Sequence, residues 1–151
     1  MSAATRAGTR PELSTEGPQR QLTQQSSPEL WGRLVFEATR LAHIREGRSA
    51  VSPVDSRALL VADRDEPAVP EATLAPGAPV EPAHVHGVHD TSLHLVLPRQ
   101  RAEQVCADGW GVPHAYGDFG TEILVYGPRD ADELALVLGL VRESIAFARG
   151  E

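Results

Sequence analysis

Five of the chain's six histidines lie between residues 84 and 114, and three of them follow an alternating pattern. His84 and His86 are separated by one valine, and His94 stands between two leucines of a short apolar segment. Alternate side chains of a β-strand share one face, so each segment can present its imidazoles on one side. Imidazole ligates metals and titrates near physiological pH, so the spacing indicates either metal binding or proton transfer.

The histidines fall in two segments that we predict to be strands, residues 83–88 and residues 92–97, joined by a tight turn near Asp90. The leucines of the second segment alternate, and they should share the face that packs on the core. His94 lies between these leucines, and it should therefore point to the opposite face, together with Val96.

A hairpin that turns at this point places His86 opposite His94, and His84 opposite Val96. Directly opposed Cβ atoms are about 4.5–5.5 Å apart, so three imidazoles should line one face of the hairpin. A shift of one residue in register would break the cluster. His89 lies in the turn, where we expect it to be solvated.

Three interpretations of this face are open. The first is a metal site, because a His-x-His pair and a third histidine across the ladder form a three-histidine set. The second is a metal-free acid/base site, because histidine can shuttle protons at neutral pH. The third is a polar face of stacked histidines without chemistry. The residues alone do not decide between them.

Trp110 and His114 lie on a Gly-rich connection, residues 110–120, and can wall a pocket for a flat organic molecule. Trp110 equally suits a position that plugs the end of the core. Tyr126 and Arg129 are further candidates for substrate binding, although Arg129 also suits a cap or an ion pair with Asp130 or Asp132. The chain has no glycine-rich nucleotide loop and no nucleophile elbow, so flavin, nicotinamide and nucleotide chemistry have no support.

Composition excludes several classes of protein. The net charge of −7 disfavours nucleic-acid binding, which needs clustered cations. The single cysteine, Cys106, cannot form an intrachain disulfide and suits a buried helical position. No apolar run approaches the roughly 20 residues needed to cross a bilayer, and no secretory signal is evident. We therefore expect a cytoplasmic protein that binds neither nucleic acid nor membrane.

The expected fold class is α+β, a small antiparallel or mixed sheet with about three helices packed against it. Residues 1–26 are rich in Ser, Thr, Gln, Gly and Pro, which predicts a disordered tail. Residues 27–151 then form a single domain. Its expected elements are a helix from Ser27 to about Gly47, a strand over 57–62, a long Pro-rich loop over 63–82, the two histidine strands, a helix from Pro98 to about Asp108, a strand over 121–126 and a last helix starting at Asp130.

The order of these segments resembles the luciferase-domain family, which includes fungal luciferases and mostly uncharacterised bacterial members. The resemblance covers residues 57–149, and its motifs are His84-Val-His86-Gly, Asp90-Thr-Ser-Leu-His-Leu-Val-Leu-Pro98, Gly109-Trp-Gly-Val-Pro-His114, Tyr126-Gly-Pro-Arg-Asp-Ala-Asp-Glu-Leu134 and Ser144-Ile-Ala-Phe. Fungal luciferases are oxygenases that act on a hydroxylated pyrone without flavin or haem. The resemblance implies a metal-independent site for a conjugated, enolisable molecule. Its implied residues are His84, His86, His94, Trp110 and His114.

We therefore predict a small cofactor-independent enzyme of specialised metabolism that acts on an enolisable polyketide-like or aromatic substrate by histidine acid/base catalysis. The reaction is an oxygenation, a cyclisation or an isomerisation, because each starts from a stabilised enolate. The alternatives are a non-catalytic module that binds a small molecule or a partner, and a histidine-ligated metalloenzyme. No cofactor is predicted, O2 is the co-substrate of the oxygenase case, and a homodimer is compatible. The predicted catalytic residues, also the ligands if a metal is bound, are His84, His86 and His94, and the predicted substrate-binding residues are Trp110, His114, Tyr126 and Arg129.

Overall fold

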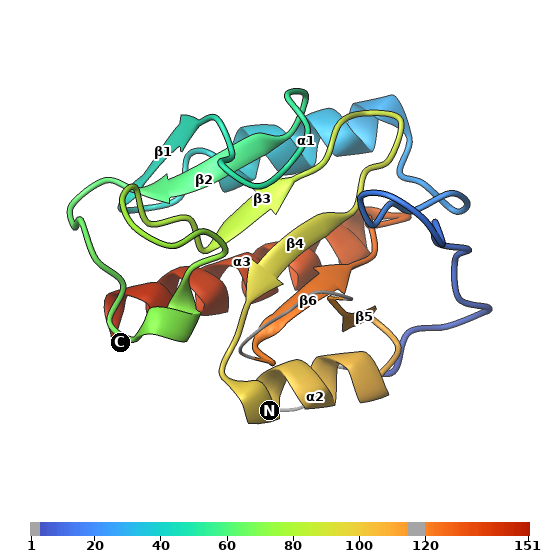
Figure 1. The fold of residues 1–151 in the computed structure, drawn as a ribbon. Helices are drawn as coiled ribbons and strands as arrows, with labels where there is room; N and C mark the ends of the chain where they lie inside the picture. The colour runs from blue at the N-terminus through green and yellow to red at the C-terminus, as the bar shows by residue number, and fades with distance from the viewer. Residues whose placement is uncertain (1–3, 115–119) are drawn as a thin grey trace.

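Six antiparallel strands form one open sheet in the order β1-β2-β3-β4-β6-β5 (Figure 1). The computed structural model describes residues 4–114 and 120–151. The strands are β1 (Ile44–Gly47), β2 (Arg57–Val61), β3 (Ala83–Val85), β4 (Leu93–Val96), β5 (Gly111–Pro113) and β6 (Glu122–Val125). The helices are α1 (Pro28–Ala38), α2 (Arg99–Ala107) and α3 (Ala131–Arg149), with a short 3-10 turn η1 (Pro70–Ala72). The predicted α+β class is confirmed.

Helices α1 and α3 pack together on one face of the sheet, while α2 lies beside β5 and β6 (Figure 1). The core lies between the sheet and these helices. It includes the three alternating leucines of the second histidine segment, Leu93, Leu95 and Leu97, as the alternation predicts. His94 is therefore on the face turned away from the helices. That opposite face carries the candidate site.

The last helix follows its sequence signals closely. The Asp130 side chain accepts a hydrogen bond from the backbone N–H of Glu133, which satisfies one of the unpaired donors of the first turn. Gly150 ends the helix in the left-handed conformation with φ of 74°. Ser144, which is fully buried, donates its hydroxyl to the carbonyl of Pro82 at 3.0 Å. This bond ties α3 to the residue before β3.

Replacing Ser144 with alanine should lower the free energy of unfolding by about 0.5–1.5 kcal/mol, because the Pro82 carbonyl then loses one of its two donors and keeps only the Val96 N–H. Urea denaturation followed by circular dichroism measures the change. Arg142→Ala, at an exposed position of the same helix, is the control and should change stability by less than about 0.5 kcal/mol. Equal stabilities of the two variants would contradict the anchoring role of Ser144.

The first helix is shorter than predicted. Its start is as expected, because the Ser27 side chain accepts from Leu30 N–H. It ends at Ala38 instead of near Gly47. Thr39 donates its hydroxyl to the carbonyl of Val35 at 2.7 Å, a local bond that competes with continuation of the helix. The chain then turns and pairs as β1 along the edge of β2, so edge pairing overrides the helical periodicity.

The register of the histidine hairpin also differs from the prediction. His84, not His86, lies opposite His94, a shift of two residues. The turn is centred one residue earlier than Asp90, because the carbonyl of Gly87 accepts the N–H groups of both Asp90 and Thr91. Thr91 has a φ of 73°, which tightens the turn. A shift of two preserves which face each side chain occupies, so the cluster survives.

Three segments without periodicity prove to be structured. Residues 4–26 lie against the domain with Arg6 and Gln21 buried, which differs from the expected disordered tail. The loop over 63–82 contains η1 and the buried Val80, so it covers the sheet more closely than a mobile surface loop would. The Gly-rich connection contributes β5, and its residues 115–119 lie outside the described residues.

Candidate functional site

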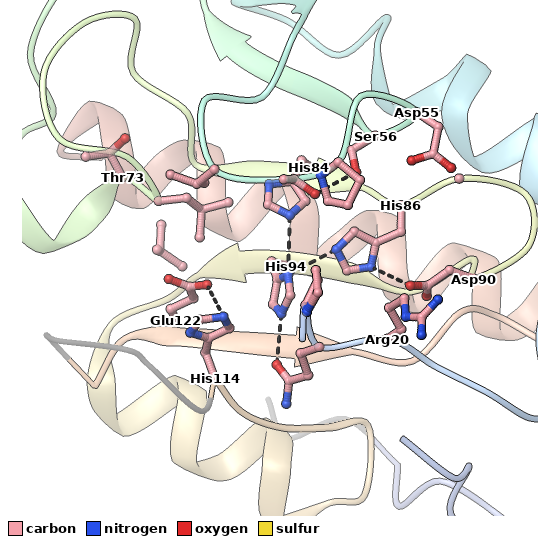
Figure 2. A pocket seen from close by; sticks show the side chains of 18 of the residues that line it. Arg20, Asp55, Ser56, Thr73, His84, His86, Asp90, His94, His114 and Glu122 are labelled. Carbon is pink, nitrogen blue, oxygen red and sulfur yellow. Dashed lines mark hydrogen bonds and ion pairs between the residues drawn. The ribbon is translucent and has the colours of Figure 1, made fainter. Parts of the chain in front are cut away.

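Three imidazoles converge on one point: His84 of β3, His94 of β4 and His86 of the turn between these strands (Figure 2). His84 Nε2 lies 3.3 Å from His94 Nδ1, and His86 Nε2 lies 3.1 Å from the same atom. All three side chains are buried, each with at most 5% of its surface exposed. The cluster that the sequence predicted on one face of a hairpin is therefore present, with its rings turned toward one another.

The outer nitrogen of His84 contacts a buried carboxylate. His84 Nδ1 lies 2.8 Å from Glu81 Oε2, and Glu81 is 1% exposed. The same carboxylate accepts the Ser49 hydroxyl at 2.7 Å and the backbone N–H of Ala50 at 3.2 Å. A carboxylate can only accept in these bonds, so His84 carries its proton on Nδ1. Its Nε2, which faces the cluster, is then a lone pair.

The outer nitrogen of His86 is held by the turn. Ser92 donates its hydroxyl to Asp90 Oδ1, so the Ser92 oxygen can accept from His86 Nδ1, 2.8 Å away. The second oxygen of Asp90 lies 3.3 Å from the same nitrogen. His86 therefore also carries its proton on Nδ1 and directs the lone pair of Nε2 into the cluster. Trp31 of α1 donates to the His86 carbonyl at 2.7 Å and fixes the backbone there.

The third outer nitrogen contacts the N-terminal segment. His94 Nε2 lies 2.9 Å from Gln19 Oε1. The amide nitrogen of Gln19 donates to the Pro113 carbonyl at 3.4 Å, an acceptor that orients the amide oxygen toward His94. His94 is then protonated on Nε2, and its Nδ1 is a lone pair. Three lone pairs meet at the centre of the cluster with no proton between them, so they repel one another unless a positive charge lies there.

Burial disfavours protonation of two of the rings, His84 and His94. It lowers the pKa of His84, and this effect outweighs the hydrogen bond to Glu81. Burial also lowers the pKa of His94 far below its ordinary value, and the neighbouring His86 and His84 add to the effect. For Asp90, burial alone would raise the pKa, but the contacts with His86 and Ser92 hold it below its usual range. Two of the clustered imidazoles, His84 and His94, thus have a lowered pKa, and they lie near an Asp90 carboxylate whose pKa is also lowered.

The cluster lies at the wall of a cavity of about 1260 Å³. This is somewhat larger than the roughly 300–1,000 Å³ typical of small-molecule sites. The other walls come from residues 17–25, 51–56 and 65–77, the segments that lack sequence periodicity. Among the described residues, the charged side chains that line it are Arg20 and five carboxylates, Asp55, Asp65, Glu66, Asp90 and Glu122. The cavity therefore suits a neutral organic molecule better than an anionic one.

His114 lies beside the cluster on the cavity wall, as the sequence predicted. Its ring centroid is 4.7 Å from that of His94, in an edge-on arrangement. Its Nε2 lies 3.4 Å from Glu122 Oε2, and both side chains are half-buried. Burial lowers the pKa of His114. His94, His114 and Glu122 form a second set with metal-ligand geometry.

The other predicted substrate-binding residues do not line this cavity. Trp110 packs in the core, and its Nε1 donates to the Ala4 carbonyl at 2.6 Å. Tyr126 is buried, with the Arg6 guanidinium 5.1 Å from its ring centre. Arg129 forms an ion pair with Glu133 at 2.6 Å, a different partner from the expected Asp130 or Asp132. Trp110, Tyr126 and Arg129 are thus close to the histidines in the sequence but do not line the cavity.

Sequence reasoning missed the partners of the histidines. Glu81 falls at the end of the Pro-rich loop, and Gln19 falls in the expected tail, so neither belonged to a recognised element. One signal for Glu81 was available, since a charged residue stands two positions before a short strand that is apolar apart from His84. Gln19 had no signal, because its contact joins residues 75 positions apart.

A family model and several curated proteins match the chain. Residues 80–144 match the luciferase domain, a segment that holds Glu81 and all the clustered histidines. A luciferase of Armillaria ostoyae is 40% identical over 73 residues, which cover 44% of this chain and 27% of the fungal protein. A luciferase of Armillaria mellea is 38% identical over a segment of the same length. The predicted resemblance to the luciferase-domain family is confirmed.

A longer match extends beyond the histidine hairpin. A luciferase of Neonothopanus nambi is 28% identical over 158 residues, which cover 94% of this chain and 59% of that protein. The matched segments thus cover between 27% and 59% of the length of these fungal proteins, less than two thirds in each case. No solved structure matches it. Within the described residues, none of the helices is both long enough and apolar enough to cross a membrane.

Proposed function

We propose that this chain, whose residues 80–144 match the luciferase domain, is an enzyme acting on a neutral, enolisable conjugated molecule. The catalytic centre would be the cluster of His84, His86 and His94. One observation carries the proposal: three nitrogen lone pairs converge at the wall of a cavity large enough for a polycyclic substrate. Light emission is not part of the proposal.

Enolate formation suits the electrostatics of the site. An enolate carries negative charge on oxygen and needs a positive partner at close range. The cluster can provide it, because Glu81 and Asp90 lie behind two of its rings and stabilise positive charge there. One source of that charge is a proton that moves from the substrate's hydroxyl or acidic carbon to a ring nitrogen, a transfer that the lowered pKa of His84 and His94 opposes. The other source is a bound cation, as argued below.

His114 would contact the substrate from the side of the cavity. It lies next to His94 but outside the cluster, and its partner Glu122 orients its ring. His114→Ala should therefore raise KM more than it lowers kcat, because it removes a contact made with bound substrate in the ground state as well. Steady-state kinetics of the two proteins measure the split. An unchanged KM with a collapsed kcat would instead place His114 in the chemical step.

A substrate panel tests the proposed function. Purified protein is incubated with neutral hydroxypyrones, phenolic ketones and 1,3-diketones, with and without O2. Substrate loss is followed by chromatography with mass detection, and O2 uptake is followed with an electrode. We expect conversion of at least one compound class, lost in both His84→Ala and His86→Ala. Binding without conversion would indicate a non-catalytic binding module, and retained turnover in both variants would overturn the assignment of the cluster.

A further inference from the structure

We propose that His84 Nε2, His86 Nε2 and His94 Nδ1 bind one divalent first-row transition-metal ion, with an open coordination position toward the cavity. This deepens the proposed function, since the ion would be the positive partner of the enolate. The metal site itself rests only on the geometry of the chain. Three protein ligands with one open position are typical of catalytic rather than purely structural metal centres.

The spacing of the nitrogens agrees with a shared ion. Nitrogens bound to one tetrahedral ion at about 2.0–2.1 Å lie about 3.3 Å from one another. The distances from His94 Nδ1 to His84 Nε2 and His86 Nε2 are 3.3 and 3.1 Å. The ligand nitrogens of all three residues lie within 4.8 Å of one another. The rings therefore need little movement to coordinate a metal.

The outer hydrogen bonds are those that a metal-bound histidine makes. A ligating imidazole usually donates its other N–H to a carboxylate, a carbonyl or a similar acceptor, which fixes the tautomer and the ring orientation. Here the acceptors are Glu81 for His84, Ser92 with Asp90 for His86, and Gln19 for His94. All three rings are thus oriented from behind with their lone pairs inward. A proton shuttle would need only one ring oriented in this way.

The buried charge of Glu81 also supports a bound metal ion. Glu81 is 1% exposed, and its hydrogen-bond partners are Ser49, the Ala50 N–H and His84. Within the described part of the chain, no arginine forms an ion pair with it. A buried carboxylate without a cation is costly, and buried charges in proteins are paired or lie beside metals. A divalent ion one imidazole away supplies that counter-charge.

The second candidate set, His94 with His114 and Glu122, is less suited to be the primary site. His94 has only two ring nitrogens, and the one away from the cluster contacts Gln19. His114 and Glu122 already contact each other and are half-buried. Imidazole ligands alone accept several first-row ions, so the proposal names the class of metal and not the element.

Metal titration of the whole chain tests the proposal without any substrate. Protein freed of metal with EDTA is titrated with Co2+, and visible absorption is recorded. We expect one equivalent of Co2+ to give the intense bands of a four- or five-coordinate site, and Zn2+ to displace it at one equivalent. No saturable binding near one equivalent, or weak bands typical of hexaaqua Co2+, would overturn the proposal.

Variants assign the ligands. His84→Ala and His94→Ala should each lose more than the roughly 10–100-fold in affinity that removal of an outer partner costs. Glu81→Gln, which removes such an outer partner, should lose about 10–100-fold. His114→Ala and the exposed His89→Ala should bind like the unaltered protein. Unchanged affinity in the first two variants, or loss of binding only in His114→Ala, would overturn the assignment.

Nitrogen NMR tests the same assignment on the unaltered protein, so it does not require that any variant folds. Protein labelled with 15N at histidine should show His84 and His86 protonated on Nδ1 and His94 protonated on Nε2. Added Zn2+ should shift the opposite nitrogen of each ring. Shifts at the outer nitrogens, or at His114 alone, would contradict the site. If the ion binds as expected while the substrate panel shows no turnover, only the proposed function fails. Turnover that persists after metal removal contradicts only the role of the ion as the positive partner of the enolate.

Discussion

Replacing His94 with alanine is expected to lower kcat/KM by about 10³-fold or more, since positioned histidines contribute about 10²–10⁴-fold. His94 is the member of the cluster that contacts both of the others, with His84 Nε2 and His86 Nε2 at 3.3 and 3.1 Å from its Nδ1. Its removal therefore disrupts the centre whether the positive charge is a proton or a metal ion. Initial rates on the converting substrate measure the loss.

Two controls separate lost chemistry from lost folding. His43→Ala removes an exposed histidine whose partner is Asp63, away from the cavity, and should keep the activity of the unaltered protein. Added imidazole should restore part of the activity of His94→Ala, because the deleted ring leaves a space that opens on the cavity. A His94→Ala protein that is folded and as active as the His43→Ala control would show that His94 has no role in the reaction.

The success of the sequence prediction for the hairpin depends on one property of strands. Side chains alternate between two faces, so His84, His86 and His94 share a face in any register that differs by an even number of residues. The observed register differs from the prediction by two, and the cluster persists. Which histidines are directly opposite was not predictable, because the conformation of Thr91 decides the centre of the turn.

The partners of the cluster and most of the cavity could not be predicted in the same way. Glu81 and Gln19 reach the histidines through contacts that depend on how irregular segments pack on the sheet. Hydrophobic periodicity reports which face of an element is buried, and these segments have none. Trp110 takes the core position, one of the two that the sequence left open, and a long-range contact accompanies it, since the backbone carbonyl of Ala4 accepts its indole N–H. The alternation of residues along the strands therefore predicted the histidine cluster. Its hydrogen-bond partners and the cavity walls depend on long-range packing, which the alternation does not report.

Deletion of residues 1–25 is expected to lower the thermal midpoint by about 10–20 °C, because roughly 3–6 kcal/mol of stability is lost. The N-terminal segment supplies the Ala4 carbonyl to Trp110 and the Gln21 side chain to the N–H of Gly127 at 2.9 Å. The backbone N–H of Arg6, in the same segment, donates to the Asp108 carbonyl at 2.9 Å. After the deletion, Trp110, Gly127 and Asp108 would each lose a hydrogen-bond partner, and water would have to replace it.

The same deletion should also weaken the site, because residues 17–25 form one wall of the cavity and Gln19 orients His94. Gln21→Ala, which removes one buried side chain of the segment, should lower the midpoint by a smaller amount. The exposed Glu16→Ala is the matched control and should melt like the unaltered protein. Calorimetry and Co2+ titration of all four proteins measure both effects. A truly disordered tail would leave the melting temperature and the metal affinity of the truncated chain unchanged, and that outcome would contradict the packed arrangement of residues 4–26.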